Sequence, residues 1–408
     1  MINKDLENII NRYQLCTSCG LCQSVFGEAK IELTLKDNGY YTPDFKVNIK
    51  KDEEKLFHDL CPCLNMRGPK ISKRVKCDSV VGNYFDYYNG YSTNIDIRND
   101  ASTGGGITSF CSFLLKEGYV DGVLHIGEGS DILKTEASIS KTVEDIEKKM
   151  GSQYMPSSLL INIMNHLEDS ESLAVVGRPC DIHAISTLIK KYPKYEKKIF
   201  IKIAFLCGGM PSLNSTKSLI NDLGANIEEI TSLKYRGDGW PGFFKVTDKE
   251  NVYTVDYNEA WGSNLGRSVP LACKICVDSL GEYADIVFGD AWECDDKGFP
   301  IFSENEGNNL IITRNNKADN LLKLSVEKKY LVIRRENIDQ FKQIQPSQTI
   351  RRSTSKLRVK AVSLTKLRRI KFNKEHIEAI SQNSYTTTKR MKFFLGTLKR
   401  VNSTWYCK

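Results

Sequence analysis

The sequence has few histidines and no long hydrophobic runs. Its five histidines show no metal-ligand spacing, and its apolar runs fall far short of the roughly 20 residues that span a bilayer. The first ten residues are charged and lack the apolar stretch of a secretion signal. No Ser/His/Asp arrangement and no paired-carboxylate pattern is evident, so we find no hydrolytic chemistry to propose. We expect a cytoplasmic protein.

Thirteen cysteines stand out in this sequence, and they favour metal or redox ligands in a reducing compartment. The most informative segment is Cys16-Thr17-Ser18-Cys19-Gly20-Leu21-Cys22, which places three thiols on one short loop. Three thiolates at this spacing are typical of a 4Fe–4S cubane, and Cys61-Pro62 offers the remote cysteine followed by proline that commonly binds the fourth iron. The sequence therefore predicts one 4Fe–4S cluster, with the ligands Cys16, Cys19, Cys22 and Cys61.

Two alternatives stay open at this first site. A zinc knuckle would also bind four thiolates, although zinc sites usually draw two ligands from each of two loops and three come from one loop here. Cys63 is a second candidate for the fourth ligand, and the proline after Cys61 favours Cys61.

The length of 408 residues predicts two or three domains. Residues 1–75 form a ferredoxin-like 4Fe–4S piece, in which Asn38-Gly39 predicts a hairpin turn between short strands. Strand and helix patterns then alternate, which indicates an α/β main body in a protein that is α+β overall. We divide this body into residues 76–165 and 166–345, and we treat residues 346–408 as a basic, partly helical tail.

Further cysteines follow predicted strands. Cys180 comes after a strand predicted over 172–176 and Cys207 after one over 199–206, while Cys273 and Cys276 form a Cys-x-x-Cys pair. Because the ends of strands in an α/β sheet meet at one crevice, these four cysteines could converge on a second cluster. Buried structural thiols are the alternative.

A glycine-rich stretch, Ser102-Thr103-Gly104-Gly105-Gly106, opens a helix that the apolar spacing predicts from residue 107 to 115. Glycines let backbone N–H groups approach a phosphate, and the helix N-terminus favours negative charge. The stretch matches neither the nucleotide-triphosphate loop nor the dinucleotide fingerprint. It therefore predicts either a phosphate site or an ordinary tight turn.

Taken in order, these segments resemble the β subunits of the deazaflavin coenzyme F420 hydrogenases and dehydrogenases. The resemblance runs from about residue 10 to about residue 330 and includes bacterial members associated with exopolysaccharide genes. Beside the cysteine and glycine segments, the matching motifs are Val120-Asp121-Gly122-Val123, Gly151-Ser152-Gln153-Tyr154, Val176-Gly177-Arg178-Pro179-Cys180, Tyr235-Arg236-Gly237, Gly239-Trp240-Pro241-Gly242 and Gly289-Asp290-Ala291-Trp292.

The resemblance implies FAD in the main body, supplied with electrons by iron–sulfur clusters. It favours a second cluster at Cys180, Cys207, Cys273 and Cys276. The FAD contacts that it implies are Ser102, Thr103, Gly104, Gly105, Gly106, Ser152, Tyr154, Gly177 and Arg178. The sequence departs from the family at Arg178, where threonine is frequent, and at Gln153, where lysine is usual.

The leading hypothesis is an iron–sulfur flavoprotein oxidoreductase. It would pass electrons from a ferredoxin or similar donor through 4Fe–4S clusters to FAD and on to an organic substrate, for example a surface-glycan precursor. The competing hypothesis is a non-enzymatic electron-transfer subunit, or a deazaflavin coenzyme oxidoreductase subunit, that works with a separate catalytic partner. A zinc-stabilised interaction scaffold is a third alternative. No nucleic acid partner is expected.

The charge is unevenly distributed along the chain. Residues 351–408 contain 16 Lys and Arg against Glu375 and Glu378, a net charge of +14, so the other 350 residues carry −6 of the total +8. This pattern suggests an acidic partner or a peripheral contact with an anionic membrane surface. A solvated helix with disordered flanks is the alternative.

Overall fold

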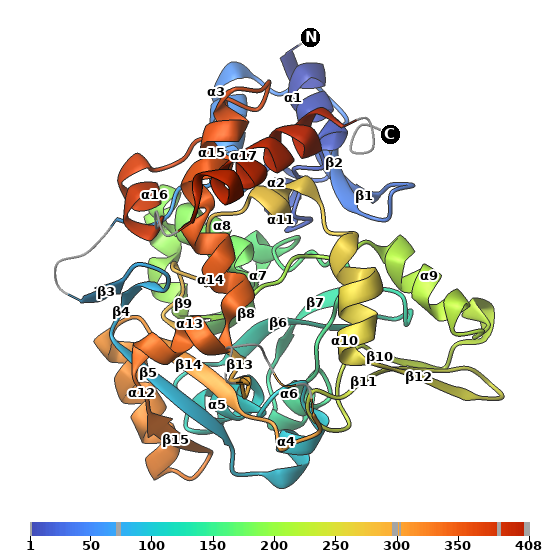
Figure 1. The fold of residues 1–408 in the computed structure, drawn as a ribbon, viewed down its shortest axis with the longest axis vertical. Coiled ribbons are helices and arrows are strands. Elements are labelled where there is room, and N and C mark those ends of the chain that lie inside the picture. Colours follow the sequence, from blue (N-terminus) through green and yellow to red (C-terminus); the bar gives the residue numbers. More distant parts are fainter. Residues whose placement is uncertain (1, 71–74, 296–300, 302, 382–384, 404–408) are drawn as a thin grey trace.

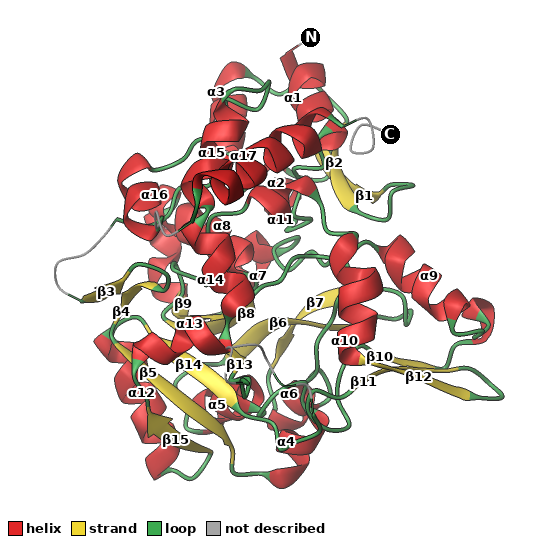
Figure 2. Ribbon diagram, viewed as in Figure 1, coloured by secondary structure: helices red, strands yellow, loops and turns green. Residues whose placement is uncertain are grey.

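An eight-stranded sheet forms the centre of the computed structural model (Figures 1 and 2). The structure describes residues 2–70, 75–295, 301, 303–381 and 385–403. Short sheets and further helices surround the large sheet, and the first described helix, α1, lies beside the last one, α17, at one end of the molecule (Figure 1).

The large sheet has the strand order β15-β5-β14-β13-β9-β8-β6-β7. In that order, its strands are Leu331–Arg335, Asp86–Ser92, Asn309–Thr313, Ile286–Asp290, Ile199–Phe205, Leu173–Gly177, Gly122–Glu128 and Thr135–Ser140. The four strands β13, β9, β8 and β6 run parallel, and every pairing outside them is antiparallel. The carboxyl ends of the parallel strands therefore lie at one edge of the sheet.

Side chains alternate between the two faces of this sheet, as the pleat of a strand requires. Leu124 and Val175 belong to one buried cluster, whereas their neighbours Val123 and Ala174 belong to another on the opposite face. Helices α7 and α8 contribute to the first cluster, and α5 and α12 contribute to the second. These helices are Ile163–Asp169, Pro179–Lys191, Gly106–Lys116 and Asn316–Glu327. The sheet is thus the middle of three layers, which confirms a mixed α/β fold.

The chain before the sheet folds into a small module of helices and one hairpin. Its elements are α1 (Ile2–Arg12), α2 (Leu21–Phe26), β1 (Ile31–Leu35), β2 (Tyr41–Phe45) and α3 (Lys51–Leu60). Strands β1 and β2 pair antiparallel on either side of Gly39, which has a φ of 77°. The hairpin predicted at Asn38-Gly39 is therefore confirmed. A second short hairpin, β3 (Lys76–Asp78) and β4 (Gly82–Tyr84), precedes the first strand of the large sheet.

A three-stranded antiparallel sheet projects beside the large one (Figure 1). It consists of β10 (Ser232–Lys234), β11 (Phe243–Thr247) and β12 (Val252–Asp256), and Phe244 packs with Leu219 of α9 in one cluster. The other short α-helices are α4 (Ile95–Asp100), α6 (Val143–Glu147), α9 (Leu213–Asp222), α11 (Leu271–Ile275) and α13 (Phe341–Ile344). Helix α10 (Tyr257–Glu259) continues as a π and a 3-10 turn to Arg267.

The C-terminal helices pack on the N-terminal module. They are α14 (Pro346–Ser353), α15 (Ser355–Ser363), α16 (Lys374–Ile380) and α17 (Thr387–Asn402), and Figure 1 shows α15 and α17 beside α1 and α3, with α14 nearer the large sheet. Val362, Ile377 and Val401 are buried in one core with Ile10 of α1 and Leu271 of α11. The alternative of a solvated helix with disordered flanks is therefore wrong for the described part of this segment, because apolar side chains recur among its basic ones. None of the described helices is long and apolar enough to cross a membrane.

Candidate functional site

The first cysteine set surrounds a small enclosed space. Cys16, Cys19, Cys22 and Cys61 all line a cavity of about 30 Å³. Cys16 and Cys19 lie in the loop between α1 and α2, and Cys22 lies in the first turn of α2. The loop turns sharply where Ser18 and Gly20 have positive φ values of 57° and 83°. A side chain at Gly20 would lie 2.8 Å from the Ile161 backbone, so glycine is needed there. Cys61 follows the last residue of α3.

Burial and mutual proximity shift the acidity of these thiols. Burial, followed by the charge of Cys61, raises the pKa of Cys16 to about 12. Burial also raises the pKa of Cys22, and the charges of Cys19, Cys16 and Cys61 raise it further. Neighbouring thiolates repel one another in a low-dielectric site, so the ionised set needs a cation among its members. This requirement suits a metal-binding role.

The second cysteine set surrounds another space. Cys180, Cys207, Cys273 and Cys276 line a cavity of about 50 Å³. Burial, followed by the charge of Cys273, raises the pKa of Cys207 to about 12. The structure thus brings together the four cysteines that the sequence places after two strands and in one Cys-x-x-Cys pair. Cys180 lies in the first turn of α8 rather than in a loop after the strand, because that helix begins at Pro179.

The chemistry of each cysteine set is compatible with a 4Fe–4S cluster. Within the described ranges, no three His, Cys, Asp or Glu side chains are grouped so that they could hold a metal ion. Zinc would draw its thiolates to about 4 Å from each other, since a Zn–S bond is about 2.3 Å long. Each set here instead places four thiols around a cavity, and four thiolates are the usual ligands of a 4Fe–4S cluster.

The two cysteine cavities share a wall. Thr17, Pro62 and Cys63 line both of them. A hydrogen bond with Cys61 and burial raise the pKa of Cys63, and the charges of Cys16 and Cys180, one from each set, act in the same direction. Cys63 is 2% exposed and lies between the two sets. The sequence presented it only as a substitute for Cys61.

A larger cavity of about 260 Å³ opens at the carboxyl edge of the parallel strands. Gly177, Leu206 and Asp290, at the ends of β8, β9 and β13, line it. The predicted flavin contacts that line this cavity are Ser102, Thr103, Gly105, Gly106, Ser152, Tyr154, Gly177 and Arg178. Gly104 is not among the lining residues, because it packs against Asn308 and Asn309.

The glycine-rich stretch forms the N-terminus of α5 at this cavity. Gly105 caps the helix with a φ of 70°, and the Gly106 N–H donates to Asn309 Oδ1 at 2.9 Å. The Ser102 hydroxyl accepts a hydrogen bond from the Ser152 N–H at 2.8 Å, which joins two predicted segments. An eleven-residue helix with its first turn in the cavity wall offers favourable dipole and N–H groups to an anion.

Arg178 is part of the wall rather than a free ligand for an anion. Its guanidinium donates to Asp181 through Nε at 2.8 Å and through Nη2 at 2.9 Å, and Nη2 also donates to the Ser157 carbonyl. Arg178 is 7% exposed. The arginine that departs from the family pattern is therefore balanced by a carboxylate three residues later on the same helix.

Sequence reasoning missed an ionic and aromatic group beside the glycine-rich stretch, where the Ser102 hydroxyl donates to the Arg236 carbonyl at 3.1 Å and the Thr103 hydroxyl donates to Asp290 at 3.2 Å. Arg236 makes a two-pronged ion pair with Asp290, with nitrogen–oxygen distances of 3.0 and 2.7 Å, and both residues line the cavity. Trp240 donates to Asp290 at 2.9 Å and stacks on Trp292 at 4.8 Å. Trp261 packs on Tyr154 at 4.9 Å. The matching motifs contain Arg236, Asp290 and both stacked tryptophans, but nothing in the sequence showed that they meet.

The larger cavity also shares a wall with the second cysteine cavity. Cys207 and Gly209 line both. Three spaces therefore lie in series, from the Cys16 set through the Cys180 set to the glycine-rich helix start. The cysteines of the two sets and the residues that line the larger cavity come from segments between residue 16 and residue 309, and the fold brings these segments together at the carboxyl edge of the large sheet.

Comparisons with known proteins agree with the sequence motifs. Two models of the family "coenzyme F420 hydrogenase/dehydrogenase, beta subunit" match this chain, the N-terminal one over residues 87–164 and the C-terminal one over residues 170–338. Together they cover more than half of it. The chain belongs to this family.

Named relatives come from methanogenic archaea. The coenzyme F420 hydrogenase subunit beta of Methanothermobacter thermautotrophicus is 27% identical over 61% of this chain and 83% of that protein. The coenzyme F420-dependent sulfite reductase of Methanocaldococcus jannaschii is 24% identical over 67% of this chain, which corresponds to 42% of the reductase. The chain is thus a member of a family of oxidoreductase subunits.

A solved structure shares the fold. One chain of the F420-reducing [NiFe] hydrogenase complex from Methanosarcina barkeri superposes with a TM-score of 0.53 at 20% identity, covering 69% of this chain and 96% of that one. This likeness supports the mixed α/β architecture alone.

Proposed function

We propose that this chain is an electron-transfer subunit that conducts electrons between two 4Fe–4S clusters and a flavin in the larger cavity. The first cluster would be held by Cys16, Cys19, Cys22 and Cys61. The second would be held by Cys180, Cys207, Cys273 and Cys276. The observation that carries the proposal is the series of three cavities in which each neighbouring pair shares wall residues.

The shared walls matter because single electrons pass between centres that lie close together. Thr17, Pro62 and Cys63 form the wall that the first and second cavities share, and Cys207 and Gly209 form the wall that the second shares with the third. A ligand cysteine that also lines the flavin cavity, such as Cys207, offers a short covalent path out of its cluster.

The residues of the larger cavity fit a flavin that carries phosphate. The first turn of α5 would hold the phosphate, with Gly105 and Gly106 allowing close approach. Tyr154 and Trp261 would pack on flat rings, and the ion pair of Arg236 and Asp290 would fix the wall beside Ser102 and Thr103. A bound flavin can collect two single electrons and deliver them as a hydride. Buried Val123, Phe288 and Cys111 would keep water away from it.

A separate catalytic partner is part of this proposal. The relatives are named as subunits of F420-dependent hydrogenase or as F420-dependent reductase, which favours a deazaflavin coenzyme or another redox protein at one end of the path. An electron donor of ferredoxin type would then meet the other end. This support is stronger than any for a glycan-precursor substrate, which rests on the resemblance to exopolysaccharide-associated members alone.

Anaerobic purification followed by metal, sulfide and flavin analysis tests the proposal. We expect about eight iron and about eight sulfide per chain, as two 4Fe–4S clusters require, with noncovalent FAD. Serine in place of Cys19 should remove about half of the iron, and serine in place of Cys273 should remove the other half. Protein that contains zinc and neither sulfide nor flavin would refute the proposal.

A further inference from the structure

The C-terminal helices supply arginines to the second cysteine site. The family models end at residue 338, so α14 and α15 lie outside the matched part of the chain. Arg351 on α14 lines the second cavity together with the four cysteines. Its Nη1 donates to the carbonyls of Cys207 at 3.3 Å and Gly208 at 3.2 Å, and its Nη2 donates to the carbonyl of Cys273. One guanidinium thus holds the loop after β9, which carries Cys207, to helix α11, which carries Cys273.

A second arginine extends this contact. Arg358 on α15 is buried, and its Nη1 donates to the carbonyls of Lys274 at 2.9 Å and Cys276 at 3.1 Å. Three of the four cysteines in the set therefore have their backbone carbonyls held by the C-terminal helices. The acceptors of Arg351 are all neutral carbonyls, whereas Arg178, on the other side of the set, is balanced by Asp181.

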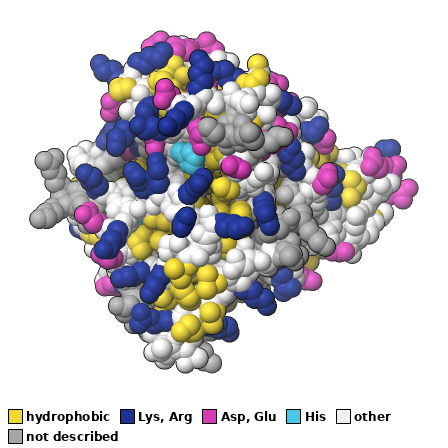
Figure 3. Space-filling model, turned by 90° about the horizontal axis from the view of Figure 1, so that it is seen from above, with side chains coloured by type: hydrophobic (Ala, Val, Ile, Leu, Met, Phe, Trp, Pro, Cys, Tyr) yellow, Lys and Arg dark blue, Asp and Glu magenta, His cyan; other side chains and the backbone are white. Residues whose placement is uncertain are grey.

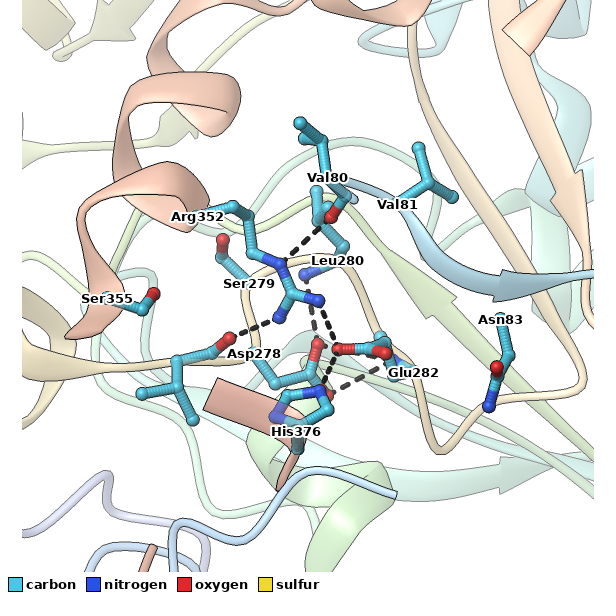
Figure 4. A network of polar contacts seen from close by, with 12 residues as sticks. Val80, Val81, Asn83, Asp278, Ser279, Leu280, Glu282, Arg352, Ser355 and His376 are labelled. Atoms are coloured by element: carbon cyan, nitrogen blue, oxygen red, sulfur yellow. Dashed lines mark hydrogen bonds and ion pairs between the residues drawn. The ribbon is translucent and has the colours of Figure 1, made fainter. Parts of the chain in front are cut away.

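A buried ion network anchors α14 to the loop that follows Cys276 (Figure 4). Arg352 and His376 both contact Glu282, and the His376 Nε2 lies 2.7 Å from Glu282 Oε1. Arg352 also donates through Nε to the Val80 carbonyl at 2.9 Å. The side chains of Arg352, Glu282 and His376 are at most 1% exposed. Because its neighbour Arg352 is fixed in this way, Arg351 has a defined position at the cavity.

We propose that Arg351 is a positioning residue of the second iron–sulfur site and raises the reduction potential of the cluster held there. This inference rests on the proposed function, because it requires a cluster on the second cysteine set. Reduction adds one electron to the cluster, and a nearby fixed positive charge stabilises the more negative, reduced form. Net charge and hydrogen bonding around a cluster are the means by which a protein tunes its potential. The C-terminal segment thereby completes a site that the matched part of the chain leaves open on one side.

The test is an EPR-monitored redox titration of the anaerobically purified full-length holoprotein and its variants. In Arg351→Gln, we expect the equilibrium constant for reduction of the second cluster to fall at least tenfold, which is about 59 mV for a one-electron couple. Arg351→Lys keeps the charge and should retain most of the potential. Arg368→Gln removes the same charge from an exposed residue between α15 and α16 and should change neither cluster.

Each outcome decides the inference. An unchanged second midpoint in Arg351→Gln, or an equal fall in Arg368→Gln, refutes it while leaving the proposed function intact. Loss of the second cluster alone in Arg351→Gln, with the first cluster's signal retained and the potential restored in Arg351→Lys, supports it. If Arg351→Gln loses both clusters, Arg351→Lys decides. A wild-type potential of the second cluster in Arg351→Lys then supports the role of the charge, and a potential as low as that expected for Arg351→Gln refutes it. A wild-type protein with about four iron per chain refutes the proposed function itself.

Discussion

Replacing Arg352 with glutamine should destabilise the whole protein, although Arg352 lies in the segment beyond the matched family. The side chain of Arg352 is 1% exposed and that of Glu282 is fully buried. Without Arg352, the Glu282 carboxylate would lose its ion pair with an arginine and keep its contact with His376 and the more indirect charge of Arg314, and the Val80 and Val277 carbonyls would lose a donor. A buried charge that loses its partner is among the most costly single changes in a protein.

The magnitude follows from two separate arguments. Removal of one partner from a buried ion pair typically costs about 3–5 kcal/mol. Burial alone would raise the pKa of Glu282, but the charges of Arg352 and His376 hold it at about 2 instead of 4.5. At about 1.4 kcal/mol per pKa unit, this lowering corresponds to about 3 kcal/mol of net favourable interaction, to which Arg352 contributes together with His376 and Arg314. We therefore expect Arg352→Gln to lower the free energy of unfolding by about 3 kcal/mol at pH 7.

Urea unfolding of the anaerobic protein, followed by far-UV circular dichroism at pH 7, measures this loss. Arg368→Gln, an exposed arginine in the same segment, serves as the control and should leave the transition in place. The double variant Arg352→Gln/Glu282→Gln should recover part of the loss, because no buried charge is then left without a partner. A single variant as stable as the control, or a double variant with fully additive losses, would contradict this account of the network.

Four further results are expected. Cys61→Ser should remove the first cluster, whereas Cys63→Ser should keep it, as iron analysis and EPR would show; the reverse pattern would make Cys63 the ligand. Gly105→Ala should reduce the FAD content at least tenfold, because a methyl group there would lie 2.8 Å from Ile97 and the backbone has a φ of 70°. FAD retained at the wild-type level would argue against this helix start as the flavin site. Because the pKa of Glu282 is depressed, the stabilising contribution of its carboxylate is complete above about pH 4.5 and should be lost as the pH falls toward 2. Glu282→Gln should therefore flatten the acid limb of a plot of unfolding free energy against pH. Neutralising the exposed Lys and Arg side chains of α17 should abolish any binding to anionic vesicles; equal binding by wild type and variant, or no binding by either, would exclude a membrane contact through this helix. Figure 3 shows Lys and Arg side chains spread over one face of the molecule among acidic and hydrophobic ones.

The sequence was sufficient to predict the parts of this molecule whose signals are local. The Cys16 loop, the Asn38-Gly39 hairpin and the helix start at Gly105 each depend on a few neighbouring residues, and the structure has them close to their expected places. The second cysteine set was predictable only in outline, because its convergence depends on how the strands that precede Cys180 and Cys207 pair.

Long-range partners were beyond the reach of the sequence. Arg236 and Asp290 are 54 residues apart, and only the fold reveals that they form a pair at the cavity. The buried contacts of the basic C-terminal segment were missed for a related reason. Its positive charge suggested a surface role. In the structure, however, Arg352 contacts the buried carboxylate of Glu282, and Arg351 contacts backbone carbonyls of the second cysteine set. The number of charged residues in a segment does not show which of their side chains are buried.

The most direct test of the central claim is an EPR and visible spectrum of the anaerobic protein during stepwise chemical reduction. The account predicts two reduced 4Fe–4S signals that broaden or split each other when both clusters are reduced, since their cavities share a wall, together with bleaching of a bound flavin. A single isolated cluster signal, two signals that do not interact, or spectra without flavin would contradict it.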